Sequence, residues 1–150
     1  MRAWIYTLAP FIESVDALRI CPDDPLGPDR LKNRFTSFTL NGWMSSEASP
    51  SFDNLRKINE TKRSILAFEL SERQGLDEYA DHVHSFNWFS TSRKENDTVY
   101  AAVSAEVAVA RHAMTAHYVY CDGHVENIAD SDIRRLCSAP WETPEFSRPR

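Results

Sequence analysis

The sequence predicts an α+β fold, in which an N-terminal helix packs on a small antiparallel β-sheet and long irregular loops join the strands. Apolar residues recur at helical spacing near the start of the chain, and residues 65–70 are almost continuously apolar. A third segment alternates polar and apolar residues and doubles back through Asp122-Gly123. With 150 residues and 42% hydrophobic content, the chain suits a single domain spanning residues 1–150.

The N-terminal helix is expected within residues 1–18, and Pro10 should kink or restart it because proline lacks a backbone donor. An apolar stripe of this kind should be buried against the sheet. A proline-rich stretch over residues 21–28 follows and predicts an extended loop. The stripe consists of Trp4, Leu8, Phe11, Ile12 and Val15.

Four strands are expected, over residues 35–40, 65–70, 117–121 and 124–128. Asp122-Gly123 favours a two-residue type I′ turn between the last two, with positive φ at both residues. Valines repeat every four residues over 99–107, and a capped apolar pattern covers 131–137, so both segments favour short helices. Residues 75–98 are expected to form a long ordered excursion that packs by its aromatic side chains.

Charge and composition exclude several classes of protein. The net charge is -5 and no stripe of Lys and Arg exists, which argues against a nucleic-acid partner. No apolar run approaches the roughly 20 residues of a membrane-spanning helix, and no signal peptide opens the chain. Three scattered cysteines allow at most one disulfide and do not indicate a redox compartment.

All five histidines fall between positions 82 and 124, which suggests a metal site. Two histidines that are two residues apart point to the same side of an extended segment, and others flank the predicted hairpin. Imidazoles with a carboxylate suit zinc or another divalent ion. Local roles in capping and turn formation are the competing interpretation. The candidate ligands are His82, His84, His112, Asp122 and His124.

Two other kinds of binding site are open to consideration. Loop carboxylates could bind calcium at Asp23-Asp24 or at Asp77, Glu78 and Asp81, although neither pattern is an EF-hand. Aromatic side chains could form a carbohydrate-stacking face, with packing in the core or under a loop as the alternative. These aromatics are Trp43, Phe86, Trp88 and Phe89.

Catalysis has little support in the sequence. No serine lies in a G-x-S-x-G elbow, Cys121 falls inside a predicted strand, and four scattered glycines cannot form a phosphate loop. We therefore expect that the protein has no catalytic residues and is not an enzyme.

Four short motifs carry a resemblance to a known family. His112 is followed by nine residues and then Asp122-Gly123, and residues 21–25 read CPDDP. Residues 36–42 (TSFTLNG) are similar to an "SYxxN" strand, and residues 10–13 (PFIE) to a "PYLE" element. In this order, the motifs resemble prepilin-like (pseudopilin) proteins of the H-X(9)-DG type. The leader and long hydrophobic helix typical of that family are not seen in this sequence.

This resemblance implies a pilin-like fold and a non-catalytic structural or binding role. The implied setting is a pilus-like or type II secretion-like assembly outside the cytoplasm, at the periplasm or cell surface. Its partners would be other pilin-like subunits or cell-surface proteins, and some pseudopilins hold calcium in a loop. The alternatives are a metal-binding domain, hydrolytic or not, and a carbohydrate-binding surface protein.

Overall fold

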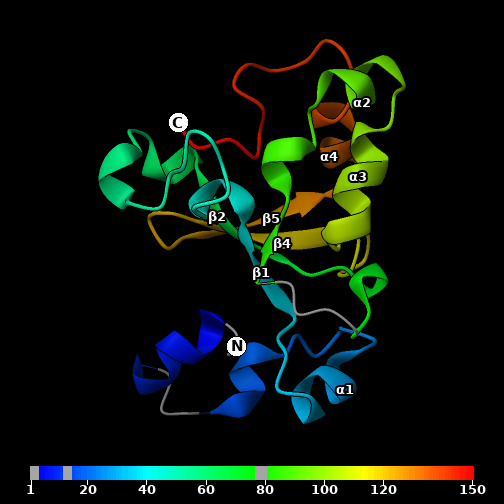
Figure 1. The fold of residues 1–150 in the computed structure, drawn as a ribbon. Helices are drawn as coiled ribbons and strands as arrows, with labels where there is room; N and C mark the ends of the chain where they lie inside the picture. The colour runs from blue at the N-terminus through cyan, green and yellow to red at the C-terminus, as the bar shows by residue number, and fades with distance from the viewer. Residues whose placement is uncertain (1–3, 12–14, 77–80) are drawn as a thin grey trace.

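The computed structural model describes residues 4–11, 15–76 and 81–150 and has an α+β architecture, as the sequence predicts (Figure 1). A five-stranded sheet crosses the middle of the molecule in the order β3-β1-β2-β4-β5. All neighbouring strands are antiparallel except β1 and β3, which are parallel. The strands are β1 (Phe38–Asn41), β2 (Ile65–Glu69), β3 (His82–Val83), β4 (Thr115–Tyr120) and β5 (Val125–Ala129).

The helices are short. The α-helices of the described part are α1 (Gly27–Lys32), α2 (Thr91–Glu95), α3 (Val99–Glu106) and α4 (Asp130–Leu136). The four expected strands and the helices near residues 99–107 and 131–137 are confirmed, whereas the sequence does not predict the two-residue strand β3. Single 3₁₀ turns or helices cover Trp4–Phe11, Asp16–Arg19, Gly42–Met44, Leu55–Lys57, Thr61–Arg63, Glu72–Gln74 and Ser85–Asn87.

The hydrophobic core lies between one face of the sheet and the helices α3 and α4. Figure 1 shows α2, α3 and α4 gathered on one side of the sheet. Because side chains alternate along a strand, Phe68 of β2 and Tyr118 of β4 both reach this face. Trp88 is 1% exposed and its ring centroid lies 5.5 Å from that of Phe68. The segment around Trp88 is thus anchored by aromatic packing, as expected.

The turn between β4 and β5 differs from the prediction. The Gly123 N–H donates to the Tyr120 carbonyl, and the Tyr120 N–H donates to the His124 carbonyl, both at 2.9 Å. Gly123 has a φ of 92°, while Asp122 is outside the positive-φ region. These contacts define a three-residue loop, in which a type I turn is followed by a left-handed glycine in a bulge. The predicted hairpin is confirmed, but the prediction of a two-residue type I′ turn is wrong.

The N-terminal segment also departs from expectation. Trp4–Phe11 is a 3₁₀ helix, and Leu8, Phe11 and Val15 are 38%, 82% and 44% exposed. The predicted burial of an apolar stripe against the sheet is therefore wrong for these residues. A 3₁₀ helix has three residues per turn, so residues four apart no longer share a face. Ile12 of the stripe lies outside the described residues. In Figure 1 the segment lies on the side of the sheet away from α2, α3 and α4.

A buried ion pair attaches the N-terminal part to the end of the sheet. Asp24 Oδ2 lies 2.9 Å from Arg30 Nε and accepts a hydrogen bond from Ser37 Oγ at 2.7 Å. Arg30 also donates to the Ser71 carbonyl, just beyond β2. The loop at residues 21–24 is thereby held beside the last residue of β2.

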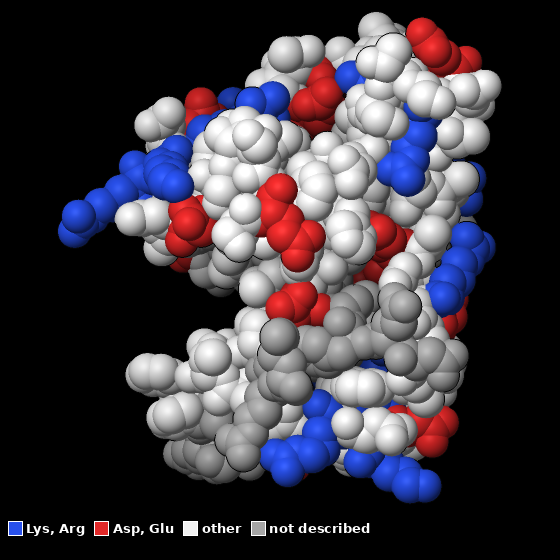
Figure 2. Space-filling model, in the orientation of Figure 1, with Lys and Arg blue, Asp and Glu red and all other residues white. Residues whose placement is uncertain are grey.

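Two surface properties bear on function. None of the helices in the described ranges is both long and apolar enough to cross a membrane. On the face drawn in Figure 2, Lys and Arg are scattered among Asp and Glu, without a broad basic area.

Candidate metal centre

Glu69, the last residue of β2, is a carboxylate that is only 2% exposed. Phe68 faces the core, so Glu69 points to the opposite face of the sheet. The β2–β4 register pairs Phe68 with Tyr118, and continuing it by one residue places His117 beside Glu69. Glu69 Oε1 lies 2.9 Å from His117 Nδ1 and 2.8 Å from His112 Nε2. A single buried carboxylate oxygen therefore lies against two imidazoles.

The loop that precedes α1 completes this cluster. Cys21 Sγ lies 3.6 Å from His112 Nε2, and Asp23 Oδ2 lies 2.7 Å from His112 Nδ1. One ring nitrogen of His112 thus faces a thiol and a carboxylate, and the other is held by a second carboxylate. Residues from three distant parts of the chain converge on this imidazole.

Neighbouring charges fix the backbone on both sides of the cluster. Arg111 is 2% exposed at its side chain, donates to the Leu70 carbonyl at 2.7 Å, and lies 3.6 Å from Asp24. Because Asp24 also pairs with Arg30, the loop and the strand that leads to His112 share one buried ionic network. This network positions Cys21 and His112 before any ligand arrives.

The electrostatics of the cluster favour a cation. Burial by itself lowers the pKa of His112, but hydrogen bonds to Glu69 and Asp23 outweigh it and the net shift raises that pKa. Burial raises the pKa of the Cys21 thiol. Glu69 Oε2 is buried without a hydrogen-bond partner in the described part of the chain. Since an unsatisfied buried acceptor costs about 1–3 kcal/mol or more, a cation bound at Glu69 would remove a real penalty.

One pair of donor atoms already has the spacing that a zinc ion requires, and a second pair lies closer together. The ligand atoms of Cys21, Glu69 and His112 lie within 4.8 Å of one another. Tetrahedral zinc, with bonds of about 2.3 Å to sulfur and 2.0–2.1 Å to nitrogen, sets these two atoms about 3.6 Å apart. The Cys21 Sγ–His112 Nε2 distance is 3.6 Å. The 2.8 Å between Glu69 Oε1 and His112 Nε2 is a hydrogen-bond length and would have to open by about half an ångström.

The second layer of contacts is of the kind found around metal sites. A metal-ligating histidine usually donates its other ring N–H to a carboxylate or a carbonyl, which fixes its tautomer and orientation. Asp23 Oδ2 is placed to accept this bond from His112 Nδ1, and Glu69 Oε1 is placed to accept one from His117 Nδ1. With the Cys21 thiolate, the acids of the network, Glu72 included, exceed Arg30 and Arg111 by three charges. A divalent cation would offset two of these charges.

The five expected metal ligands do not form one site. His112 belongs to the cluster around Glu69, whereas His124 lies at the other end of β4, against Asp122 at 2.5 Å. The five residue steps from Thr115 to Tyr120 separate the two ends by about 17 Å. His82 and His84 lie elsewhere, next to Glu47. The expectation of a shared site is therefore wrong, because the strand between His112 and His124 is extended.

The other expected sites fare differently. Asp24 is occupied by Arg30 and Asp23 by His112, so these two acids do not converge on a calcium site. Asp77 and Glu78 lie outside the described residues, and Asp81 pairs with His82.

The expected carbohydrate-stacking face loses one of its aromatic residues. Trp88 is buried in the core and cannot stack on a sugar, so its place in that face is wrong. Trp43 packs edge-on against Phe86, and Phe89 packs edge-on against Trp141 and Phe146.

Sequence reasoning missed three members of the cluster: Cys21, Glu69 and His117. Cys21 stands out in the sequence only within the CPDDP motif, and His117 only as one of the five histidines. Glu69 carries the clearest signal, because it is a single acid inside the apolar run 65–70. A charged residue is almost never fully buried unless it has a partner, so its position in a central strand points to an imidazole or a cation.

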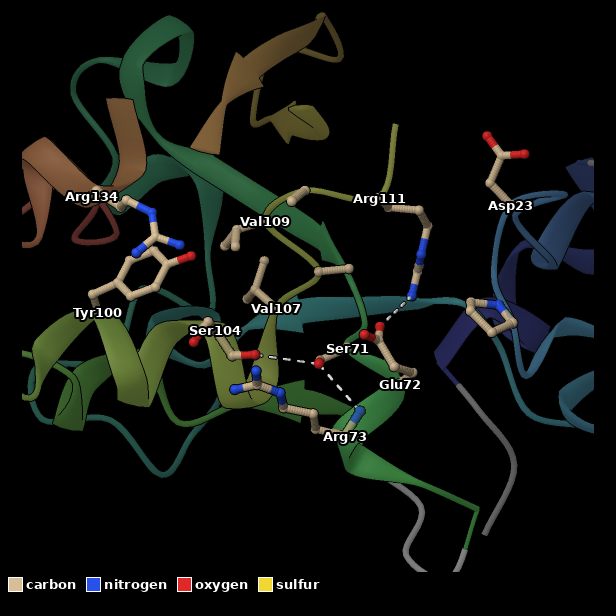
Figure 3. A pocket seen from close by; sticks show the side chains of 13 residues that line it. Asp23, Ser71, Glu72, Arg73, Tyr100, Ser104, Val107, Val109, Arg111 and Arg134 are labelled. Carbon is tan, nitrogen blue, oxygen red and sulfur yellow. Dashed lines mark hydrogen bonds and ion pairs between the residues drawn. The ribbon is translucent and has the colours of Figure 1, made fainter. Parts of the chain in front are cut away.

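A polar pocket of about 320 Å³ lies beside the centre and is lined at one side by Asp23 (Figure 3). Figure 3 shows Arg111 directed towards Glu72, with 3.6 Å between their charged atoms, and Arg134 lying over Tyr100. Arg134 also pairs with Asp130 at 2.8 Å. Because these two basic groups already face acids, they do not single out an anionic ligand for the pocket.

Comparison of the chain with protein-family models, curated proteins and solved structures gives no match. The functional proposal therefore rests on the contacts of the centre itself.

Proposed function

We propose that the protein is a metal-binding module in which Zn²⁺, held by Cys21, Glu69 and His112, fixes the N-terminal loop to the sheet. The observation that carries this proposal is the 3.6 Å between Cys21 Sγ and His112 Nε2, beside a buried carboxylate with one oxygen unpaired among the described residues. A thiolate, an imidazole and a carboxylate together select zinc over calcium, which prefers oxygen ligands alone.

Burial supports a structural role for this metal. Cys21 is 4% and Glu69 2% exposed, so a substrate has little access to an ion between them. The three ligands belong to the N-terminal loop, to β2 and to the segment before β4, so one ion would close two long loops of the chain. Because these three ligands come together only in the folded chain, the energy of metal binding becomes folding energy. We therefore favour a stabilising crosslink over hydrolysis.

Cobalt is a direct probe of this centre. Co²⁺ bound to a cysteine thiolate produces a sulfur-to-metal charge-transfer absorption in the near ultraviolet. Titration of the purified, reduced protein with Co²⁺ should produce this band, and Zn²⁺ should remove it by displacement. Cys21→Ser should abolish the band, while the control Cys121→Ser should retain it because Cys121 lies in the β4–β5 loop. A band that survives Cys21→Ser, or none in the unsubstituted protein, would contradict the proposal.

A role in an extracytoplasmic pilus-like assembly is a second candidate, supported by the exposed apolar side chains of the N-terminal segment. Phe11 is 82% and Leu18 58% exposed, and Leu8 and Val15 of the same segment are exposed as well. Apolar side chains concentrated in one exposed segment are typical of interaction sites. Other pilin-like subunits or cell-surface proteins are the partners that the sequence motifs suggest.

Association can be measured without knowledge of the partner. Sedimentation equilibrium should show weak, concentration-dependent self-association that is lost in Phe11→Ser/Leu18→Ser. The matched control, Leu55→Ser, replaces another exposed leucine (58%) and should leave association unchanged. A protein that stays monomeric at all concentrations would count against association through this segment.

A further inference from the structure

A second group of possible metal ligands lies at the β3 edge of the sheet. The ligand atoms of Glu47, His82 and His84 lie within 4.8 Å of one another. His82 belongs to β3, and its side chain is 14% exposed. His82 Nε2 is buried without a hydrogen bond in the described part of the chain, and lies 3.4 Å from Glu47 Oε2. A buried ring nitrogen that faces a carboxylate without a hydrogen bond requires an explanation.

Carboxylates hold both imidazoles by the same ring nitrogen. His82 Nδ1 lies 2.7 Å from Asp81 Oδ1, and His84 Nδ1 lies 3.2 Å from Glu106 Oε1. This leaves Nε2 of each ring as the nitrogen available to a ligand. A carboxylate on the remote nitrogen is the usual second contact of a metal-bound histidine, and here it occurs twice.

The support for His84 extends into the core. Glu106, at the end of α3, accepts hydrogen bonds from the His84 backbone N–H at 2.9 Å and from Trp88 Nε1 at 2.8 Å. Since Trp88 is buried against Phe68, this carboxylate is fixed by a rigid part of the fold. A ligand set supported in this way is preorganised, as a binding site requires.

We propose that Glu47, His82 and His84 form a second, open site for a divalent transition-metal ion. Two imidazoles and one carboxylate on one side of an ion leave several coordination positions free for solvent or a small anion. His84 is 56% and Glu47 60% exposed, so this ion exchanges with solution, unlike an ion buried between Cys21 and Glu69. The second site shares no ligand with the first and does not depend on it.

Zinc stoichiometry in single variants tests this site. Calorimetric titration of the purified full chain with Zn²⁺ should give two equivalents for the unsubstituted protein. His82→Ala and Cys21→Ser should each bind one equivalent, and the control His124→Ala should still bind two. One equivalent that is lost in His82→Ala and kept in Cys21→Ser would support the second site and refute the first. If His82→Ala binds as much zinc as the unsubstituted protein, the proposal of the second site is overturned.

A milder substitution and a second readout guard against misfolding of His82→Ala. Glu47→Gln changes an exposed side chain and should weaken zinc binding at the second site by about tenfold or more, without changing the first. In the Cys21→Ser background, which lacks the first site, electron paramagnetic resonance with one equivalent of Cu²⁺ should show coupling to two imidazole nitrogens, reduced to one when His84→Ala is added. A Cu²⁺ spectrum that does not change when His84→Ala is added would overturn the proposal.

Discussion

Cys21 and His112 are 91 positions apart in the sequence, yet Cys21 Sγ lies 3.6 Å from His112 Nε2. A second contact joins the same two segments, because Asp24 and Arg111 form a buried ion pair with 3.6 Å between their charged atoms. The CPDDP loop and the residues that open the H-X(9)-DG motif therefore form a single polar junction at the end of β2. These motif residues have a physical role here, which is to fix the N-terminal part to the sheet.

The buried ion pair is expected to contribute strongly to stability. Asp24→Asn removes the negative charge beside Arg30 and leaves that guanidinium buried and uncompensated. Loss of one member of a buried pair costs about 3–5 kcal/mol of unfolding free energy. Urea unfolding followed by circular dichroism measures this change. Asp53→Asn is the matched control, since Asp53 and Lys57 are both about half exposed and such pairs contribute about 0–1 kcal/mol.

Gly123 is expected to be the position in the β4–β5 loop that is least tolerant of a β-branched residue. Its φ of 92° lies in the left-handed region, and no atom lies within 4 Å of the position that a Cβ would occupy, so the cost is backbone strain alone. Gly123→Val should lower the unfolding free energy by about 1–3 kcal/mol, and Gly123→Asn by less. Urea unfolding of the two variants measures both losses. Equal losses would mean that strain at this residue is not the cause.

His124 should titrate above the usual range for histidine. Its hydrogen bond to Asp122 raises the pKa of His124 above 6.5, and the same contact lowers the pKa of Asp122. The contribution of His124 to stability is therefore complete below the unfolded-state pKa and is lost as pH rises through the folded-state pKa. Proton NMR of the ring should show this shift, and Asp122→Asn should move the pKa back towards 6.5. An unchanged titration in Asp122→Asn would show that Asp122 is not its source.

The parts of the fold that were predictable are those set by local patterns. Alternation over residues 117–128 predicts the hairpin, and the valines at 99–107 predict α3. The prediction of the turn type was wrong because the Tyr120–His124 hydrogen bond makes the loop one residue longer. The prediction of a buried N-terminal stripe was wrong because the segment is a 3₁₀ helix, whose period differs from that of an α-helix.

The candidate centre could be predicted only in pieces. His112 is a candidate ligand in the sequence, and Cys21 belongs to a short motif, but no local pattern states that the two meet. Their contact depends on the strand order, which places β2 beside β4, and on the buried pair between Asp24 and Arg30. Long-range pairings of this kind follow from tertiary packing, which a pattern along the chain does not encode.

The central claim is that a metal at Cys21, Glu69 and His112 stabilises the fold. It is tested most directly by the unfolding free energy with free Zn²⁺ held at 100 times its dissociation constant, compared with excess chelator. Both proteins compared carry His82→Ala, which removes the second site, and one also carries Cys21→Ser. We expect zinc to add about 2.7 kcal/mol when Cys21 is present and nothing measurable when it is replaced. Equal effects of zinc on the two proteins would contradict the account.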